Sequence, residues 1–141
     1  MRYRTFIALL APLLLGACET MSAYSVQPST YSGVRLYQTY CASCHGLTAH
    51  GDGPVQPMIG AGVPDLTQIS QRNGGQFPRE KIRQIIDGRT QYAAHGTRKM
   101  PVWGFEFHPG SSNEAAAQRE ADETINRLVK YLETIQPDYY Q

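Results

Sequence analysis

The sequence lacks the features that mark nucleic-acid-binding proteins, zinc-binding proteins and β-rich domains. Its formal net charge is only +1, so there is no excess of basic residues to displace counterions from phosphates. It has three cysteines, and its one closely spaced cysteine pair lacks the second ligand pair at defined spacing that a zinc site of this type needs. No segment alternates apolar and polar residues as a half-buried strand does, and no repeat is present. A chain of 141 residues with this pattern is expected to form one helical domain.

The first 17 residues have the composition of an export signal. Arg2 and Arg4 precede an apolar run from 6 to 15 that is too short to span a membrane. The run ends in Leu15-Gly16-Ala17-Cys18, which resembles the lipobox at which bacterial lipoproteins are cleaved and lipidated. We therefore predict a lipoprotein signal peptide over residues 1–17 and a lipid on Cys18. The alternative is an ordinary secretory signal in which Cys18 has no role.

The predicted cleavage defines the mature chain and its location. It leaves 11 basic residues against 12 acidic ones, a net charge of −1, so no basic patch remains for nucleic acid. Residues 18–32 are rich in Ser, Thr, Tyr, Gln and Pro without an apolar period, which is typical of a flexible tether. We expect a lipid-anchored protein on the periplasmic side of a bacterial membrane.

Three segments have the apolar spacing of helices. The first runs from Gly33 to about Tyr40, with Ser32 as its N-cap. The second runs from Arg79 to Asp87, and Gly88 ends it. The third runs from Asn113 or Glu114 to Ile135 and has the clearest apolar stripe. We predict one domain over residues 33–136, followed by a short tail over 137–141.

The segment from Gly46 to Phe77 holds seven glycines and three prolines, and we expect only a short helical turn in it, from Thr67 to Asn73-Gly74. A loop this long is uncommon inside a compact domain. A large, flat, apolar ligand would account for it, because loops can bury their apolar residues against the ligand.

The sequence Cys41-Ala42-Ser43-Cys44-His45 matches the C-x-x-C-H motif for covalent haem attachment. On a helical turn, cysteines three residues apart project from one face, so both sulfurs can bond the vinyl groups along one porphyrin edge. The following histidine then places its imidazole under the iron. A redox-active dithiol, a zinc site and a chance match are the alternatives, but the chain lacks the βαβ pattern and the second ligand pair that the first two require.

The second axial ligand of the iron must come from elsewhere in the chain. Met100 is the leading candidate, because it precedes a proline in a turn region and offers a soft thioether. Met58 follows the motif too closely to reach the opposite face of the ring. The nitrogen ligands that remain as alternatives are His50, His95 and His108.

Three segments together resemble the class I c-type cytochromes of bacteria: the haem motif followed by Gly46, the run Pro64-Asp65-Leu66-Thr67, and the run Met100-Pro101-Val102-Trp103. The resemblance extends from Gly33 to Ile135. It implies an all-α cytochrome c fold of three to four helices, with long Gly- and Pro-rich loops wrapped around one covalent haem c. It further implies that the first and last helices cross closely, with Gly33 and Tyr37 against Leu128 and Tyr131.

The resemblance also implies roles for three further residues. The carbonyl oxygen of Pro64 would accept a hydrogen bond from Nδ1 of His45. Trp103 would lie near the haem edge and its propionates. Arg89 could serve the propionates too, but we favour a solvated surface position for it. The segments 46–64 and 105–113 are longer than in the shortest family members, so the correspondence of Pro64 to the family's proline is less direct.

The expected function is electron transfer rather than catalysis. An iron held by four porphyrin nitrogens, His45 and Met100 has no open position for a substrate. Redox partner proteins would dock transiently at the exposed haem edge. The two alternatives are a haem c subunit of a larger respiratory or dehydrogenase complex, and a haem sensor or peroxidase with a displaceable Met100.

Overall fold

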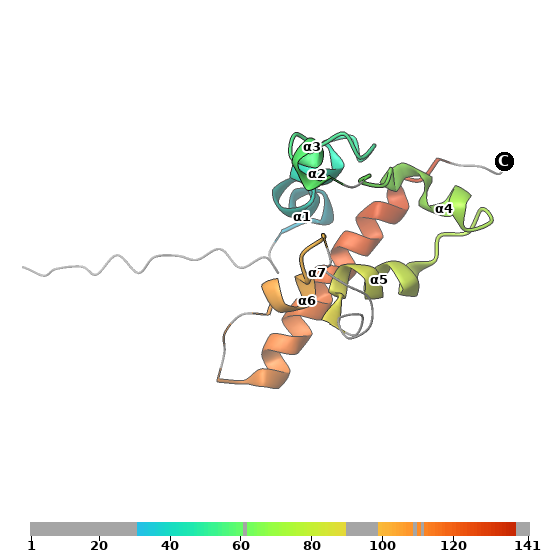
Figure 1. Cartoon of the computed structure of the whole chain (residues 1–141). Helices are drawn as coiled ribbons and strands as arrows, with labels where there is room; N and C mark the ends of the chain where they lie inside the picture. Colours follow the sequence, from blue (N-terminus) through green and yellow to red (C-terminus); the bar gives the residue numbers. More distant parts are fainter. Residues whose placement is uncertain (1–30, 61, 90–98, 109, 111, 138–141) are drawn as a thin grey trace, which may run out of the picture.

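The computed structural model describes residues 31–60, 62–89, 99–108, 110 and 112–137, and every regular element within these ranges is helical (Figure 1). This confirms the predicted all-α fold. The elements are α1 Gly33–Tyr40, α2 Ala42–His45, α3 Gln56–Ile59, the 3₁₀ turn η2 Leu66–Gln68, α4 Ile69–Arg72, α5 Arg79–Asp87, α6 Trp103–Glu106 and α7 Glu114–Thr134.

The three longest helices, α1, α5 and α7, begin and end close to the residues that the sequence predicted. The side chain of Ser32 caps α1 by accepting a hydrogen bond from the backbone N–H of Arg35. Asn113 caps α7 in the same way through the N–H of Ala116, at 3.1 Å. Gly88 ends α5 in the left-handed conformation at φ 72°, which a residue without a Cβ adopts at little cost.

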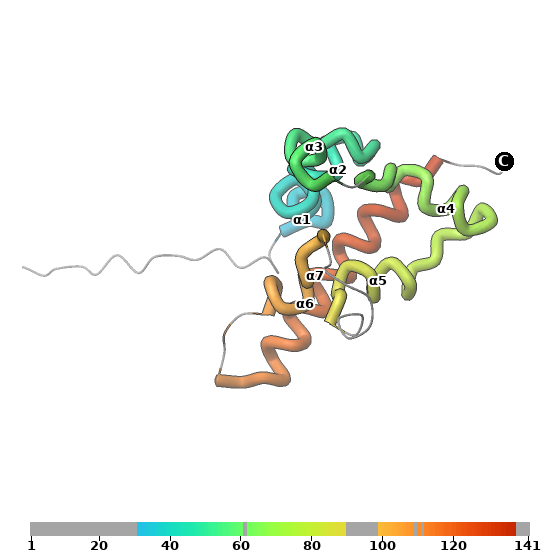
Figure 2. Tube along the Cα trace, viewed as in Figure 1, coloured from blue at the N-terminus to red at the C-terminus, as the bar shows by residue number. Residues whose placement is uncertain are grey.

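The long helix α7 forms the centre of the domain, and α1 and α5 both pack against it (Figures 1 and 2). Its predicted apolar stripe supplies much of the core, because Ile125, Leu128, Val129 and Leu132 are all buried. From α1, the core receives Leu36 and Tyr37, both fully buried.

The predicted close crossing of α1 and α7 is present. A Cβ atom on Gly33 would lie 2.3 Å from the carbonyl oxygen of Arg127 and 2.8 Å from Cβ of Tyr131. The rings of Tyr37 and Tyr131 meet beside this point, with centroids 5.3 Å apart. Only a glycine allows the two backbones to approach this closely.

Three of the one-turn helices were not predicted as separate elements. α3 lies within the Gly- and Pro-rich segment, α6 overlaps the start of the 105–113 segment, and α2 contains the last four residues of the haem motif. A four-residue helix cannot repeat an apolar period, so sequence spacing carries no signal for it. The predicted turn from Thr67 to Asn73-Gly74 corresponds to η2 and α4.

The crossing predicts a stability effect for Gly33→Ala. Alanine normally favours a helix over glycine, yet here its methyl group would push against the backbone of α7. We expect the free energy of unfolding to fall by about 1–3 kcal/mol in denaturant titrations. Gly110→Ala is the control, because a Cβ atom there meets nothing within 4 Å. An equal change in the two variants would contradict the prediction.

Candidate haem-binding site

Cys44 and His45 lie on the single helical turn α2, and Cys41 is the capping residue that joins α1 to α2. The backbone N–H groups of Cys44 and His45 both donate to the carbonyl oxygen of Cys41, at 3.1 and 2.9 Å. The hydroxyl of Tyr37 donates to the carbonyl oxygen of Gly46 at 2.6 Å, which ties the end of the turn to the buried face of α1. The turn is therefore held from both ends.

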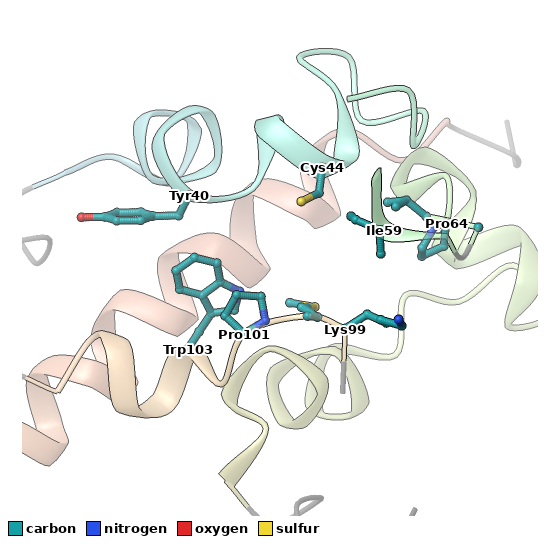
Figure 3. A pocket seen from close by; sticks show the side chains of 10 residues that line it. Tyr40, Cys44, Ile59, Pro64, Lys99, Pro101 and Trp103 are labelled. Carbon is teal, nitrogen blue, oxygen red and sulfur yellow. The ribbon is translucent and has the colours of Figure 1, made fainter. Parts of the chain in front are cut away.

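Two cavities adjoin this turn, and both are lined by Pro64 and Met100, so they are neighbouring parts of one hollow. The larger has a volume of about 240 Å³. Its other lining residues are Tyr37, Cys41, His45, Leu66, Ile69, Arg72, Asn73, Lys81, Ile82, Ile85, Ile86, Leu128 and Leu132. The smaller has a volume of about 120 Å³ and is lined also by Tyr40, Cys44, Ile59, Gly62, Val63, Lys99, Pro101 and Trp103 (Figure 3).

The hollow fits the group that the motif predicts. Taken together, the two cavities reach the range of about 300–1,000 Å³ that is usual for cofactor sites. Aliphatic side chains from η2, α4, α5 and α7 line the larger cavity, as a flat apolar macrocycle requires. Cys41 and His45 line the larger cavity and Cys44 lines the smaller one, and Met100 lines both.

His45 is arranged as a neutral imidazole ligand. Its Nδ1 lies 3.3 Å from the carbonyl oxygen of Pro64, and because that oxygen can only accept, Nδ1 is the donor. Burial lowers the pKa of His45, and the hydrogen bond to Pro64 opposes this shift without cancelling it. Its Nε2 is left without the proton and is the nitrogen that can bind a metal.

The loop after the motif sets the position of Pro64. The N–H of Gly51 donates to the carbonyl oxygen of His45 at 2.8 Å, and the N–H of Leu66 donates to the carbonyl oxygen of Ala49 at 2.7 Å. A Cβ atom on Gly51 would lie 2.3 Å from the carbonyl oxygen of Val63. The segment that sequence analysis described only as glycine-rich thus packs against the backbone beside Pro64.

The two alternative chemistries for the motif find little support. Burial, and secondarily Cys44, raises the pKa of the Cys41 thiol to about 12, whereas a redox-active dithiol needs a lowered thiol pKa. Over the residues that the structure describes, no group of three or more His, Cys, Asp and Glu side chains could hold a metal ion. A zinc site and a reactive dithiol are both disfavoured here.

Among the candidate second ligands that the structure describes, Met100 alone lines the hollow. Met58 is 78% exposed and lines neither cavity. His50 pairs with Asp65 at the surface, and His108 lies 3.2 Å from a carboxylate oxygen of Glu114. His95 lies outside the described residues.

Trp103 lines the smaller cavity across from Cys44 (Figure 3). Its ring stacks on that of Phe107 at 5.2 Å and meets the edge of Tyr40 at 5.6 Å. Phe107 is 3% exposed, so this aromatic group joins α6 to the core beside the haem motif. Sequence analysis identified Trp103 but not its partner Phe107.

The favoured prediction for Arg89 is wrong, since Arg89 is not a solvated surface residue. Its side chain is 18% exposed and pairs with Asp87 and Asp122. Because both carboxylates already occupy the guanidinium and Arg89 lines neither cavity, the structure does not support a contact with the propionates either.

The cations that do line the larger cavity are Arg72 and Lys81, which sequence analysis did not single out. Both are exposed residues, so they lie where the cavity opens to solvent. Asn73 lies between them and accepts a hydrogen bond from Nζ of Lys81 at 3.2 Å. Only the fold reveals this arrangement, since Arg72 and Lys81 are nine positions apart and belong to different helices.

The residues predicted to form the export signal and the lipid site, including Cys18, lie outside the described part of the chain. Within the described part, no helix is both long and apolar enough to cross a membrane.

Comparison with known proteins identifies one family. The family described as "Cytochrome C oxidase, cbb3-type, subunit III" matches residues 28–118, which include the motif, Pro64, Met100 and Trp103. No curated protein and no solved structure gave a match. Cytochrome c domains of this kind carry covalently bound haem c and transfer electrons through it. The chain therefore belongs to this family of class I c-type cytochromes, with Cys41 and Cys44 in position to hold the haem.

Proposed function

We propose that this cytochrome transfers single electrons between redox partners through a six-coordinate haem whose axial ligands are His45 and Met100. The observation that carries the proposal is that both side chains line the larger cavity together with Cys41, while Met100 also lines the neighbouring cavity together with Cys44. With both axial positions filled, the iron has no site for a substrate, and outer-sphere electron transfer is the remaining chemistry.

The surrounding residues favour a high reduction potential and firm retention of the haem. A thioether ligand prefers ferrous iron, and the apolar walls formed by α5 and α7 lower the local dielectric. The hydrogen bond from His45 to Pro64 fixes the imidazole plane and makes its other nitrogen a better donor. Covalent attachment through Cys41 and Cys44 prevents loss of the haem after export.

Arg72, Asn73 and Lys81 are placed to hold the haem propionates. The thioethers fix the vinyl-bearing edge of the ring at α2, and the propionates project from the opposite edge. The three polar residues come from α4, the residue after it and the start of α5, and they line the larger cavity together with Cys41 and His45. Two cations and an amide at the open end of an apolar cavity suit two carboxylates.

The Met100→Ala variant tests the ligand assignment. We expect the wild-type protein to give a low-spin six-coordinate spectrum in both oxidation states and to resist carbon monoxide when reduced. The variant should lose the low-spin spectrum and bind carbon monoxide readily, because it has an open position.

Met58→Ala is the matched control, since Met58 lines neither cavity. An unchanged Met100→Ala spectrum would move the ligand to a histidine. Ready binding of carbon monoxide by the folded wild type would favour the sensor or peroxidase alternative.

Neutralising the cations at the cavity opening tests their assignment. In Arg72→Gln and Lys81→Gln, we expect the reduction potential to fall, because a nearby positive charge disfavours ferric iron. The potential should also become more dependent on pH, since carboxylates without a cation take up protons closer to neutrality. Potentiometric titration at several pH values measures both effects. The control Lys130→Gln removes an exposed charge from α7 that lines neither cavity, and an equal shift there would contradict the assignment.

The proposed setting is the periplasmic side of a bacterial membrane, with the domain tethered through a lipid on Cys18. Support comes from the sequence alone, through the signal-like residues 1–17 and the lipobox-like run before Cys18.

Stable membership of an oxidase complex is the second candidate, and the printed description of the matching family, an oxidase subunit, favours it. Fractionation of cells that produce the Cys18→Ser variant distinguishes a lipid-tethered carrier from a subunit of a membrane complex. A tethered carrier becomes soluble, whereas a subunit stays with its membrane complex.

A further inference from the structure

A polar cluster that no part of the proposed electron transfer uses lies between α5 and α7. It consists of Asp87, Arg89, Gln118 and Asp122, and we call it the Arg89 cluster. Asp87 is only 8% exposed, and its Oδ1 and Oδ2 accept hydrogen bonds from Nε and Nη2 of Arg89 at 2.5 and 3.1 Å. Arg89 also donates to Gln118, and its Nη2 donates to Asp122 at 3.3 Å.

The Arg89 cluster forms the surface on which α6 rests. A Cβ atom on Gly104, the second residue of α6, would lie 2.0 Å from Oδ1 of Asp87 and 2.4 Å from Nε of Arg89. The α6 backbone therefore lies directly against the charged pair. Gly104 is buried, so water does not separate the two.

The proposed second ligand, Met100, lies in the segment that leads into α6. Met100 lies three residues before the start of α6, and Trp103 is its first residue. Both line the smaller cavity (Figure 3). A shift of α6 away from α5 would move Met100 and Trp103 with it, because Trp103 belongs to α6 and only Pro101 and Val102 separate Met100 from that helix.

We propose that Arg89 is a positioning residue for the axial methionine: by holding α6 against α5 and α7, the Arg89 cluster keeps Met100 on the iron and closes the sixth position. The inference rests on the proposed ligation by Met100. It assigns Arg89 a role in ligand retention rather than in contact with the haem. A bidentate guanidinium to carboxylate pair, largely shielded from water, has the rigidity that such a role needs.

The test compares Arg89→Gln with Arg79→Gln by mixing each reduced protein with carbon monoxide in a stopped-flow spectrometer. Arg79 also joins α5 to α7, through Glu133, and its side chain is not part of the Arg89 cluster on which α6 rests. Carbon monoxide binds only where the sixth position is open, so its binding rate measures the fraction of protein in which Met100 has left the iron. We expect this fraction, and with it the observed binding rate, to rise about tenfold in Arg89→Gln and to stay near the wild-type value in Arg79→Gln.

Two further variants keep the test decisive. Gly104→Ala retains every charge but pushes α6 off the Arg89 cluster, so it should raise the carbon monoxide binding rate as Arg89→Gln does. Arg89→Lys keeps one charged donor and should restore part of the wild-type behaviour.

Denaturant unfolding of the same proteins separates ligand retention from a general loss of stability. An unchanged binding rate in both Arg89→Gln and Gly104→Ala would overturn the proposal. So would a rise in Arg79→Gln of the same size, at equal loss of unfolding free energy. The spectrum of Met100→Ala is recorded first, so a failure of the ligand assignment is seen independently.

Discussion

The attachment of one large flat group to a single helical turn is the constraint on which the rest of the structure depends. In the proposed arrangement, Cys41, Cys44 and His45 fix the group along one edge and one face, and α2 is in turn held by α1 and by the loop after Gly46. The chain then has to supply only apolar walls, a second axial ligand and an opening for the propionates. This explains why a small domain can leave so much of its chain in short turns: part of its apolar surface is buried against the cofactor.

The two faces of the haem site are built in different ways. On the His45 side, the imidazole is fixed by Pro64, and Pro64 lies beside a glycine-rich loop whose N–H groups satisfy the carbonyls of α2. On the Met100 side, the chain leads from Met100 into the one-turn helix α6, and Gly104 of α6 lies against the ion pair of Asp87 and Arg89. The His45 side therefore depends on hydrogen bonds within one stretch of chain, residues 43–66. The Met100 side depends on contacts that join α6 to the ion pairs between α5 and α7.

That difference explains how much could be predicted from the sequence. The helix bounds of α1, α5 and α7 and the haem motif were visible in the sequence, because apolar period, caps and motif spacing are local signals. The α1 to α7 crossing at Gly33 and the contact of His45 with Pro64 agree with what the family resemblance implied, and the cavity position of Met100 agrees with its choice as the leading second ligand. Arg89 was misjudged and Arg72 and Lys81 were overlooked, because an arginine after a helix-ending glycine gives no sign of the carboxylates that α7 brings to it. Contacts across elements are set by the fold and leave no periodic trace in the sequence.

The most direct measurement of the central claim is the mass of the exported, fully denatured chain, taken together with its colour. We expect the unfolded polypeptide to carry the mass of one haem and to stay coloured after extraction with acid and organic solvent. Replacing Cys41 and Cys44 together by alanine should abolish both properties. A wild-type chain that is colourless, or that releases its pigment to the solvent, would contradict the account.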